Sequence, residues 1–336
     1  MGNKKKYIWE VLFLLVVFFG TVYGVFHGED LGEVMQALSE VRKVWLLPAV
    51  GCVVLFLWGE AVTLRYLLGI QEIPVTPGAC FLFSTVGFFF NCITPSASGG
   101  QPMQLYYMRR KNIPLPIATL VLMVITIAYK SVLVLLGLGI ILFGQGFVHR
   151  YLMDILPIFY FGIGLNILCV GLLLLLVFRT SLAKAILWKL LKLLEKLHVL
   201  HGSEKLWDRA EAAIGKYEQS ATFFGTHKAV VGKVFAITFL QRIALFSSTY
   251  FVYLAFGLRG ISPVTIVLLQ AVISIAADMM PLPGGMGISE TLFLAIFDPI
   301  FGEALLLPGM VLSRGLSYYT ELFISALFTV VAHFVL

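Results

Sequence analysis

The chain has 336 residues, of which 60% are hydrophobic and 12% are charged, whereas soluble domains carry about 25% charged residues. Apolar runs of about 20 residues, enough to cross a hydrocarbon layer of about 30 Å as a helix, recur along the whole chain. The net charge of +6 does not indicate nucleic-acid binding, because the basic residues lie beside apolar segments, where they set topology and attract anionic headgroups. We expect one all-α polytopic membrane domain, residues 1–336.

Six segments are each long enough to cross the membrane alone. The first follows Lys4, Lys5 and Lys6 and resembles a signal peptide, but it has no convincing small-residue cleavage site and more spans follow it. We therefore expect an uncleaved first helix. The six predicted spans are residues 7–26, 44–68, 116–143, 154–178, 229–257 and 304–335.

Two shorter apolar runs, Ala79 to Ile93 and Val267 to Met280, each end in a cluster of Pro and Gly and continue into a second short arm. Pro and paired Gly end a helix. At membrane depth such a break is tolerated only where it is buried in protein or lines a wet cavity. We expect two re-entrant hairpins whose turns contain Pro95, Gly99 and Gly100 in the first, and Pro283, Gly284, Gly285 and Gly287 in the second.

The charge distribution predicts that the hairpins enter from opposite faces. Short cytoplasmic loops carry the Lys/Arg excess, and the arrangement with both termini inside places Arg109, Arg110 and Lys111 in the cytoplasm together with the basic stretch 179–228. If the first hairpin were a full crossing, that stretch would lie outside. Within it, residues 181–200 carry leucines on one face and lysines elsewhere, which predicts either an interfacial amphipathic helix or a helix packed on the ends of others.

The two hairpin regions are related by a shift of 188 positions. This shift places Pro95 on Pro283 and Gly99 on Gly287, and with a gap of four residues Lys130 falls opposite Arg314. Inverted repeats with paired broken segments mark a midplane substrate site in transporters. We predict a first repeat core at 75–143 and a second at 263–336; two unrelated kinked helices that pack through glycine are the alternative.

Lys130, Arg242 and Arg314 lie well inside predicted spans, where each costs roughly 2.5–3.5 kcal/mol at the bilayer centre. Ion pairs with Asp278, Glu290 and Glu321 are one explanation. The other is a cavity that holds an anionic headgroup, aided by the positive N-terminal ends of the arms that start near Gly100 and Gly287. Glu60 and Arg65 are interpreted as structural residues near a helix end. The predicted substrate-binding residues are Lys130, Arg242, Arg314, Gln101, Gln104, Ser98, Ser289 and Glu290.

No pattern indicates catalysis or a bound metal. Cys52, Cys80, Cys92 and Cys169 lie in apolar stretches without CxxC spacing, and among the six histidines only His198 and His201 have helical spacing. The sequence contains no P-loop of the GxxxxGK[ST] type. We expect no catalytic residues, no metal and no cofactor.

The two clusters, Thr94 to Pro102 and Pro281 to Glu290, together resemble the signature regions of the lysylphosphatidylglycerol synthase transmembrane family, and the resemblance covers nearly the whole chain. The family includes the flippase half of multiple-peptide-resistance proteins, which move aminoacylated phosphatidylglycerol between leaflets. Carried over by position, the motif implicates Pro95, Ser98, Gly99, Gly100, Gln101, Pro283, Gly284, Gly285, Gly287 and Glu290. Nothing in the chain resembles the soluble lysyltransferase domain of the bifunctional members, so we expect no lysyl transfer from this polypeptide alone.

The resemblance implies translocation of an anionic or aminoacylated phospholipid across the cytoplasmic (inner) membrane. A family label of phosphatidylglycerol lysyltransferase, with a role in lipid modification and cationic peptide resistance, is one alternative, and a secondary transporter of a small solute is another. The expected partner is a membrane phospholipid. The sequence also leaves open a lipid-modifying enzyme partner and a homo-oligomer.

Overall fold

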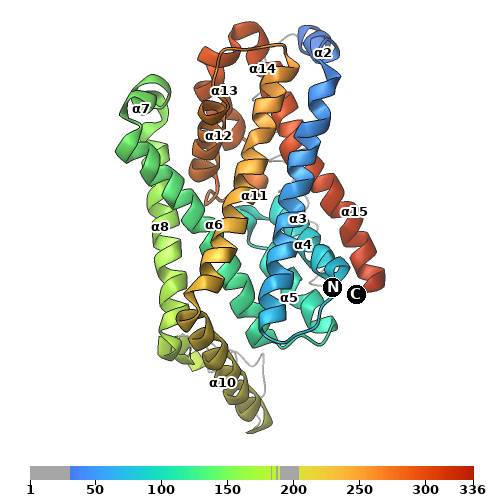
Figure 1. Ribbon diagram of the computed structural model, residues 1–336, viewed down its shortest axis with the longest axis vertical. Helices are drawn as coiled ribbons and strands as arrows, with labels where there is room; N and C mark the ends of the chain where they lie inside the picture. Colours follow the sequence, from blue (N-terminus) through green and yellow to red (C-terminus); the bar gives the residue numbers. More distant parts are fainter. Residues whose placement is uncertain (1–30, 183, 187, 190–203) are drawn as a thin grey trace, which may run out of the picture.

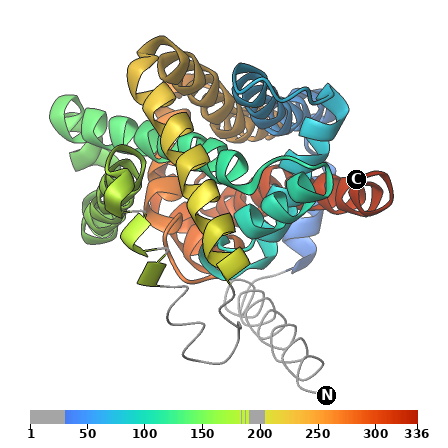
Figure 2. The same ribbon diagram turned by 90° about the horizontal axis from the view of Figure 1, so that it is seen from below.

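The computed structural model describes residues 31–182, 184–186, 188–189 and 204–336, and every regular element within them is helical. The predicted first span, 7–26, lies outside these residues. Figure 1 shows long helices running along the longest axis, and Figure 2 shows them from below, gathered into one bundle. The predicted all-α class is confirmed for the described residues. The long helices are α3 (Leu46–Ile70), α6 (Leu115–Phe143), α8 (Leu156–Phe178), α10 (Glu204–Thr226) and α11 (Lys228–Ala255).

The last long segment is interrupted. It consists of α14 (Glu303–Arg314), a π-helical turn η5 (Gly315–Tyr319) and α15 (Thr320–Val335). A π turn inserts an extra residue into the helix and often occurs at functional sites. The sequence predicts one uninterrupted helix here, since no Pro or Gly pair marks the position of the turn.

Helices apolar and long enough to cross a membrane coincide with five of the predicted spans. They are Lys43–Ile70, Leu115–Phe143, Met153–Phe178, Lys228–Ala255 and Glu303–Val335. A sixth candidate, Pro283–Phe301, includes the second arm of the second predicted hairpin. Its α-helical part, α13 (Ile288–Phe301), has 14 residues, about 21 Å at 1.5 Å per residue, which is less than a hydrocarbon core of about 30 Å. Re-entry of this hairpin stays a prediction that the helix length supports.

Each predicted hairpin is a pair of short helices around a break. The first pair is α4 (Pro77–Ile93) and α5 (Gly100–Arg110), and the second is α12 (Pro263–Ala277) and α13. Both pairs begin with a hydroxyl cap followed by proline: Thr76 accepts a hydrogen bond from the amide of Ala79, and Ser262 accepts one from Val264. In Figure 1, α12 and α13 lie above α4 and α5. The two breaks therefore face each other within the bundle.

The two breaks have the same backbone conformation. They are 3₁₀ turns, η2 (Pro95–Ala97) and η4 (Pro283–Gly285), and these ranges are related by the shift of 188 positions. Ser96 has φ 52° and its equivalent Gly284 has φ 56°, while Ala97 has φ 52° and its equivalent Gly285 has φ 65°. The local repeat in sequence is thus a repeat in geometry. An inverted repeat over the full cores 75–143 and 263–336 stays a prediction.

Each hairpin packs into its own apolar cluster. The second hairpin contributes Val272 and Phe297 to a cluster with Phe159 of α8. The first contributes Phe83 and Met108 to a cluster that includes residues of α3 and α6. Across the two, α3 packs along α11 and α15 packs along α4. The turns η2 and η4 contact each other, so the breaks lie where the two hairpins and their clusters meet.

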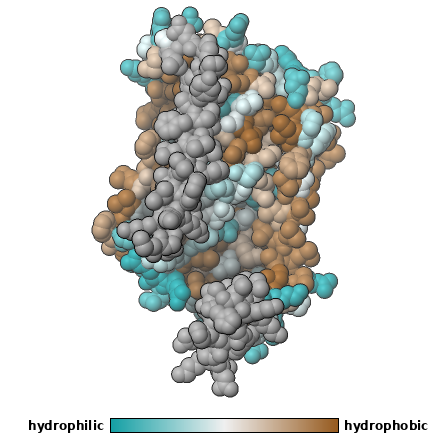
Figure 3. Space-filling model, turned by 180° about the vertical axis from the view of Figure 1, so that it is seen from behind, coloured by the Kyte–Doolittle hydropathy of each residue, from teal (hydrophilic) through white to brown (hydrophobic). Residues whose placement is uncertain are grey.

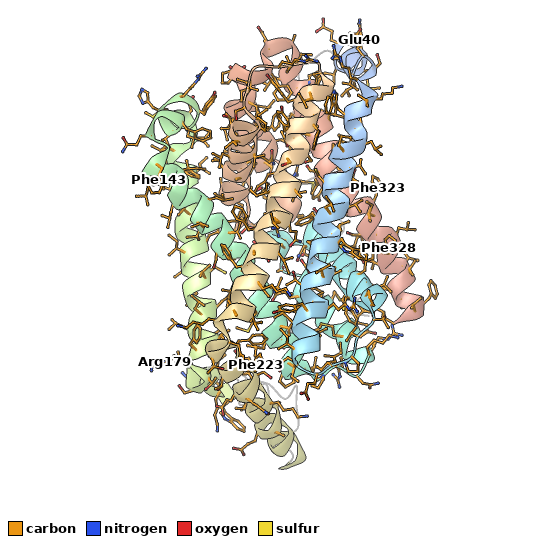
Figure 4. The ribbon with its side chains drawn as sticks, viewed as in Figure 1. Glu40, Phe143, Arg179, Phe223, Phe323 and Phe328 are labelled. Atoms are coloured by element: carbon orange, nitrogen blue, oxygen red, sulfur yellow. The ribbon has the colours of Figure 1, made fainter. Side chains whose placement is uncertain are left out.

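The outer surface of the bundle is apolar along its sides. Figure 3 shows hydrophilic residues gathered at both ends, with hydrophobic residues between them and a pale and teal strip running through this face. In Figure 4, Phe143 and Phe323 lie at the outer edges of the bundle, Glu40 lies at one end, and Arg179 at the other. Phe323 is 71% exposed and Phe143 is 89% exposed. This pattern is typical of a multi-pass membrane protein.

Helix α10 lies at the lower end of the bundle in Figure 1. It is tied to the ends of two long helices: Ser220 donates to the side chain of Gln71, which follows α3, and Tyr217 donates to the carbonyl of Leu176 in α8. Burial raises the pKa of the Tyr217 hydroxyl. The predicted helical segment 179–228 is thus helical where described, but the amphipathic stretch 181–200 lies largely outside the described residues.

Candidate functional site

The two breaks meet in the structure. The Ser96 hydroxyl lies 3.3 Å from the carbonyl oxygen of Met280, and the Tyr318 hydroxyl lies 3.0 Å from that of Cys92. A cavity of about 220 Å³ lies where they meet. It is lined by Phe56, Phe88, Asn91, Cys92, Ser96, Ala97, Tyr129, Arg242, Ser274, Ala277, Asp278, Leu282, Gly284, Gly285, Ser289, Arg314, Tyr318 and Glu321.

Lys130 forms an ion pair with Asp278, whose side chain lines the cavity. The two side chains are 9% and 11% exposed. Asp278 follows α12 and also accepts a hydrogen bond from Tyr129. A buried carboxylate held by a cation and a hydroxyl satisfies the requirement that buried charges be paired and hydrogen-bonded. This pair joins α6, in the predicted first repeat, to the second hairpin.

Arg314 forms the second buried ion pair. Its Nε lies 2.7 Å from a carboxylate oxygen of Glu290, and its terminal nitrogen donates to the carbonyl of Gly284 at 3.1 Å. The guanidinium also lies 4.5 Å from the ring centre of Tyr318. Arg314 is the last residue before the π turn, and its two hydrogen bonds tie that turn to the second break.

Arg242 is held differently. Its guanidinium carbon lies 3.6 Å from the ring centre of Tyr129 and 4.7 Å from that of Phe56, which are cation–π contacts. Its Nε is buried and has no hydrogen-bond partner among the described residues. The carboxylates of Glu60 and Glu321 lie within electrostatic range of it, but neither forms an ion pair with it within 4.0 Å. Arg242 therefore faces the cavity with unused hydrogen-bonding capacity.

Two carboxylates share the surroundings of Arg242. Glu60 of α3 accepts a hydrogen bond of 2.9 Å from the amide of Gln104 in α5. Glu321 of α15 lines the cavity, with its carboxylate 3.7 Å from the Cys92 sulfur. The interpretation of Glu60 as a residue near a helix end is wrong, because it lies in the middle of α3, which packs along α11 and so faces Arg242.

The amides at the start of both second arms already have protein acceptors. The amide of Gly99 donates to Thr94 at 2.8 Å, and that of Gly100 donates to Asn91 at 3.1 Å. In the second hairpin, the amide of Gly287 donates to Glu290 at 2.7 Å. A Cβ at position 100 would collide with Asn91, so glycine is required there for this close approach. These first amides are therefore not free to bind an anion while Thr94, Asn91 and Glu290 accept their hydrogen bonds. The role of the helix ends as anion sites stays a prediction.

The structure brings together some of the residues predicted from sequence and separates others. Arg242, Arg314 and Ser289 line the cavity, and Lys130 and Glu290 hold groups beside it. Gln104 is buried against Glu60, whereas Gln101 is exposed and donates to Thr126. Ser98 is exposed and does not line the cavity, since the left-handed turn directs Ser96 there instead. Their roles in substrate binding stay predictions.

Several lining residues were not among the sequence candidates. The rings of Tyr129 and Tyr318 face Arg242 and Arg314, while their hydroxyls donate to Asp278 and to the carbonyl of Cys92. Asn91 brings an amide to the cavity wall. The sequence offered one usable signal, because Tyr129 directly precedes Lys130 and Tyr318 follows Arg314 by one helical turn. Aromatic faces stabilise cations that are removed from water.

Comparison with known proteins identifies the family. A family described as lysylphosphatidylglycerol synthase TM region matches residues 7–325. A comparison with curated proteins gave no match. The matched region contains both broken helices and all the charged residues around the cavity. The chain therefore belongs to the lysylphosphatidylglycerol synthase transmembrane family.

Proposed function

We propose that this chain moves lysyl-phosphatidylglycerol, or another lipid whose headgroup carries an amine as well as a phosphate, between the leaflets of the membrane. The family indicates a role in handling lysylphosphatidylglycerol. The observation that carries the proposal is a cavity with charged groups of both signs, at the junction of two broken hairpins inside an apolar bundle. A headgroup can pass such a cavity while its acyl chains stay in the lipid.

The charges around the cavity favour a headgroup that carries amines. Three cations, Lys130, Arg242 and Arg314, stand beside four carboxylates, those of Glu60, Asp278, Glu290 and Glu321. A phosphodiester suits the guanidinium groups. An ammonium group suits the carboxylates, which a purely anionic headgroup would meet at a cost. Lysyl-phosphatidylglycerol carries one phosphodiester and two ammonium groups, and so complements both.

The size of the cavity implies movement. Its volume is about 220 Å³, less than the roughly 300–1,000 Å³ of typical ligand pockets. A lysylated headgroup in transit therefore requires the two breaks to separate. Among the described residues, such separation releases the hydrogen bonds from Ser96 to Met280 and from Tyr318 to Cys92, and it strains the ion pair between Lys130 and Asp278.

The lower end of the bundle is the proposed cytoplasmic side. It carries α10 and the ends of α3 and α8, and the last turn of α5 carries Arg109 and Arg110. Ile113, which follows α5, packs in one cluster with Leu67 and Phe224 at this end. An excess of Lys and Arg marks cytoplasmic loops. Thiol-labelling of single cysteines placed at Arg110 and at Glu40, from each side of sealed cells, tests this orientation.

A leaflet assay in proteoliposomes tests the proposed function. The purified chain is reconstituted with labelled lysyl-phosphatidylglycerol, phosphatidylglycerol or a prenyl phosphate, and the accessible fraction of each is followed with time. We expect protein-dependent movement of lysyl-phosphatidylglycerol that is faster than that of phosphatidylglycerol. Absence of protein-dependent movement for all three lipids would overturn the proposal.

A secondary transporter of a small solute is the second candidate. The cavity volume favours it, because about 220 Å³ is enough for a small charged molecule without movement of the breaks. Ion-gradient-driven uptake of an amino acid into the same vesicles, without movement of lipid, would establish this alternative.

A further inference from the structure

The charged groups of the cavity do not pair one to one. Lys130 pairs with Asp278 and Arg314 pairs with Glu290. This leaves Arg242 as the cation without a carboxylate partner of its own that interacts electrostatically with both Glu60 and Glu321. Among the described residues of the cavity, two carboxylates thus share a single guanidinium, and the site has one acid more than it has bases.

The described residues around Glu60 do not supply another cation. Besides Arg242, its carboxylate receives the amide hydrogen of Gln104, at 2.9 Å. Gln104 is 4% exposed and packs closely against Gly87 of α4, where a Cβ would collide with its amide group. The glutamine is therefore fixed in place as a neutral donor. Such a donor hydrogen-bonds both the ionised and the protonated form of a carboxyl group.

The surroundings of Glu321 are equally informative. The charged and titratable groups that face it are Arg242 from α11, Arg314 from α14, Glu60 from α3 and the Cys92 thiol from α4, with Tyr129 of α6 and Tyr318 of the π turn in the same cavity wall. Arg314 is already bound to Glu290 and Gly284. Unlike Glu60, Glu321 lines the cavity itself, where a ligand can reach it.

Two carboxylates that share one low-dielectric site each disfavour the ionised form of the other. A carboxylate inside the membrane that lacks its own cation is costly, and the buried Nε of Arg242, which has no hydrogen-bond partner, shows that neither acid has closed into a direct pair with it. One proton held between the two acids would remove that cost.

We propose that Glu60 and Glu321, arranged around Arg242, form a proton-binding site whose proton leaves when the ammonium group of a lipid headgroup enters the cavity beside Glu321. The carboxyl O–H bond breaks, the proton passes to water, and the carboxylate accepts hydrogen bonds from the ammonium group. The site thus binds either the proton or the ammonium group, but not both. Movement of the lipid in one direction is therefore coupled to movement of a proton in the other. This inference rests on the proposed function and supplies its energy source.

Proton release on lipid binding is the direct test. The full chain, in weakly buffered detergent micelles with a pH-sensitive dye, is mixed with micelles of lysyl-phosphatidylglycerol or of phosphatidylglycerol. We expect release of about one proton per chain with the aminoacylated lipid, and none with phosphatidylglycerol. Glu321→Gln abolishes the release, whereas Glu321→Asp, which keeps the carboxyl group, retains it. Glu40→Gln, at an exposed position just after α2 (Leu31–Ser39), leaves it unchanged.

A parallel leaflet assay under an imposed pH gradient distinguishes a failure of the proton-binding site from a failure of the proposed lipid movement. Lipid movement that accelerates with the gradient, together with proton release, supports both. If the rate of lysyl-phosphatidylglycerol movement does not depend on the pH gradient and the wild-type chain releases no proton, the proton site is overturned. The proposed function is then still supported. No movement of any lipid overturns the function itself. Size-exclusion chromatography of each variant shows that a loss of release does not come from unfolding.

Discussion

Replacement of Lys130 by methionine tests whether the buried ion pairs hold the two halves of the site together. Lys130→Met keeps an unbranched side chain only one heavy atom shorter, but leaves Asp278 without its cation. Breaking a buried pair in this way costs about 3–5 kcal/mol, because the remaining charge is uncompensated. The side chains are 9% and 11% exposed, so water replaces little of the loss. Tyr129 still donates to Asp278, and Arg242 lies against the Tyr129 ring.

Because Asp278 keeps these partners, we expect the loss of stability to lie at the low end of that range, about 3 kcal/mol. At about 2 °C per kcal/mol for a long chain, the midpoint of thermal unfolding falls by about 6 °C. The midpoint is measured in detergent as the loss of monodisperse protein with temperature. The double variant Lys130→Met/Asp278→Asn removes the orphaned charge and should recover most of the difference.

Lys184→Met is the matched control. Lys184 also forms an ion pair, with Glu211, but the two side chains are 43% and 70% exposed and their atoms lie 3.8 Å apart. Exposed pairs contribute about 0–1 kcal/mol, so its midpoint should change by less than about 2 °C. Equal losses for Lys130→Met and Lys184→Met, or a double variant no more stable than Lys130→Met, would refute the reasoning.

Three further variants test the surroundings of the cavity. Gly284→Ala should lower stability by about 1–3 kcal/mol, since φ is 56° and a Cβ would collide with Tyr318. The control Gly171→Ala, which has open space around it, should leave stability unchanged, and the thermal midpoints of the two variants are compared. Arg314→Lys keeps the charge, but a lysine cannot bond both the Glu290 carboxylate and the Gly284 carbonyl in the fork geometry of arginine. The variant should be expressed at a normal level but move lipid more slowly in the leaflet assay. Tyr129→Phe removes a donor from a buried carboxylate and should cost about 1–3 kcal/mol in the same thermal assay.

The sequence predicted the membrane architecture well because hydropathy and Pro/Gly signals act locally. The limits of all five described spans agree with the predicted ones to within two residues. The breaks at Pro95 and Pro283 were found from the same signals, and both are 3₁₀ turns. Local chemistry fixes where a helix can continue, so these features do not depend on the rest of the fold.

The polar partners depend on packing and were less predictable. Glu60 faces Arg242 only because α3 packs along α11, a contact between residues nearly two hundred positions apart. Sequence assigns depth along each helix but not the direction in which a side chain points. For the same reason the sequence did not indicate Ser96, which the conformation of Ser96 and Ala97 brings to the cavity, while the predicted role of Ser98 stays a prediction.

The two matching turns differ in one respect that has a mechanical consequence. Gly284 and Gly285 adopt positive φ freely, but Ser96 and Ala97 adopt it at a cost of about 1–2 kcal/mol each. The first turn thus stores backbone strain, whereas the second turn does not. If the two hairpins separate as proposed for lipid transit, the first turn can relax toward an ordinary conformation, which would favour the separated state. The pair would then open unevenly, with the first hairpin leading.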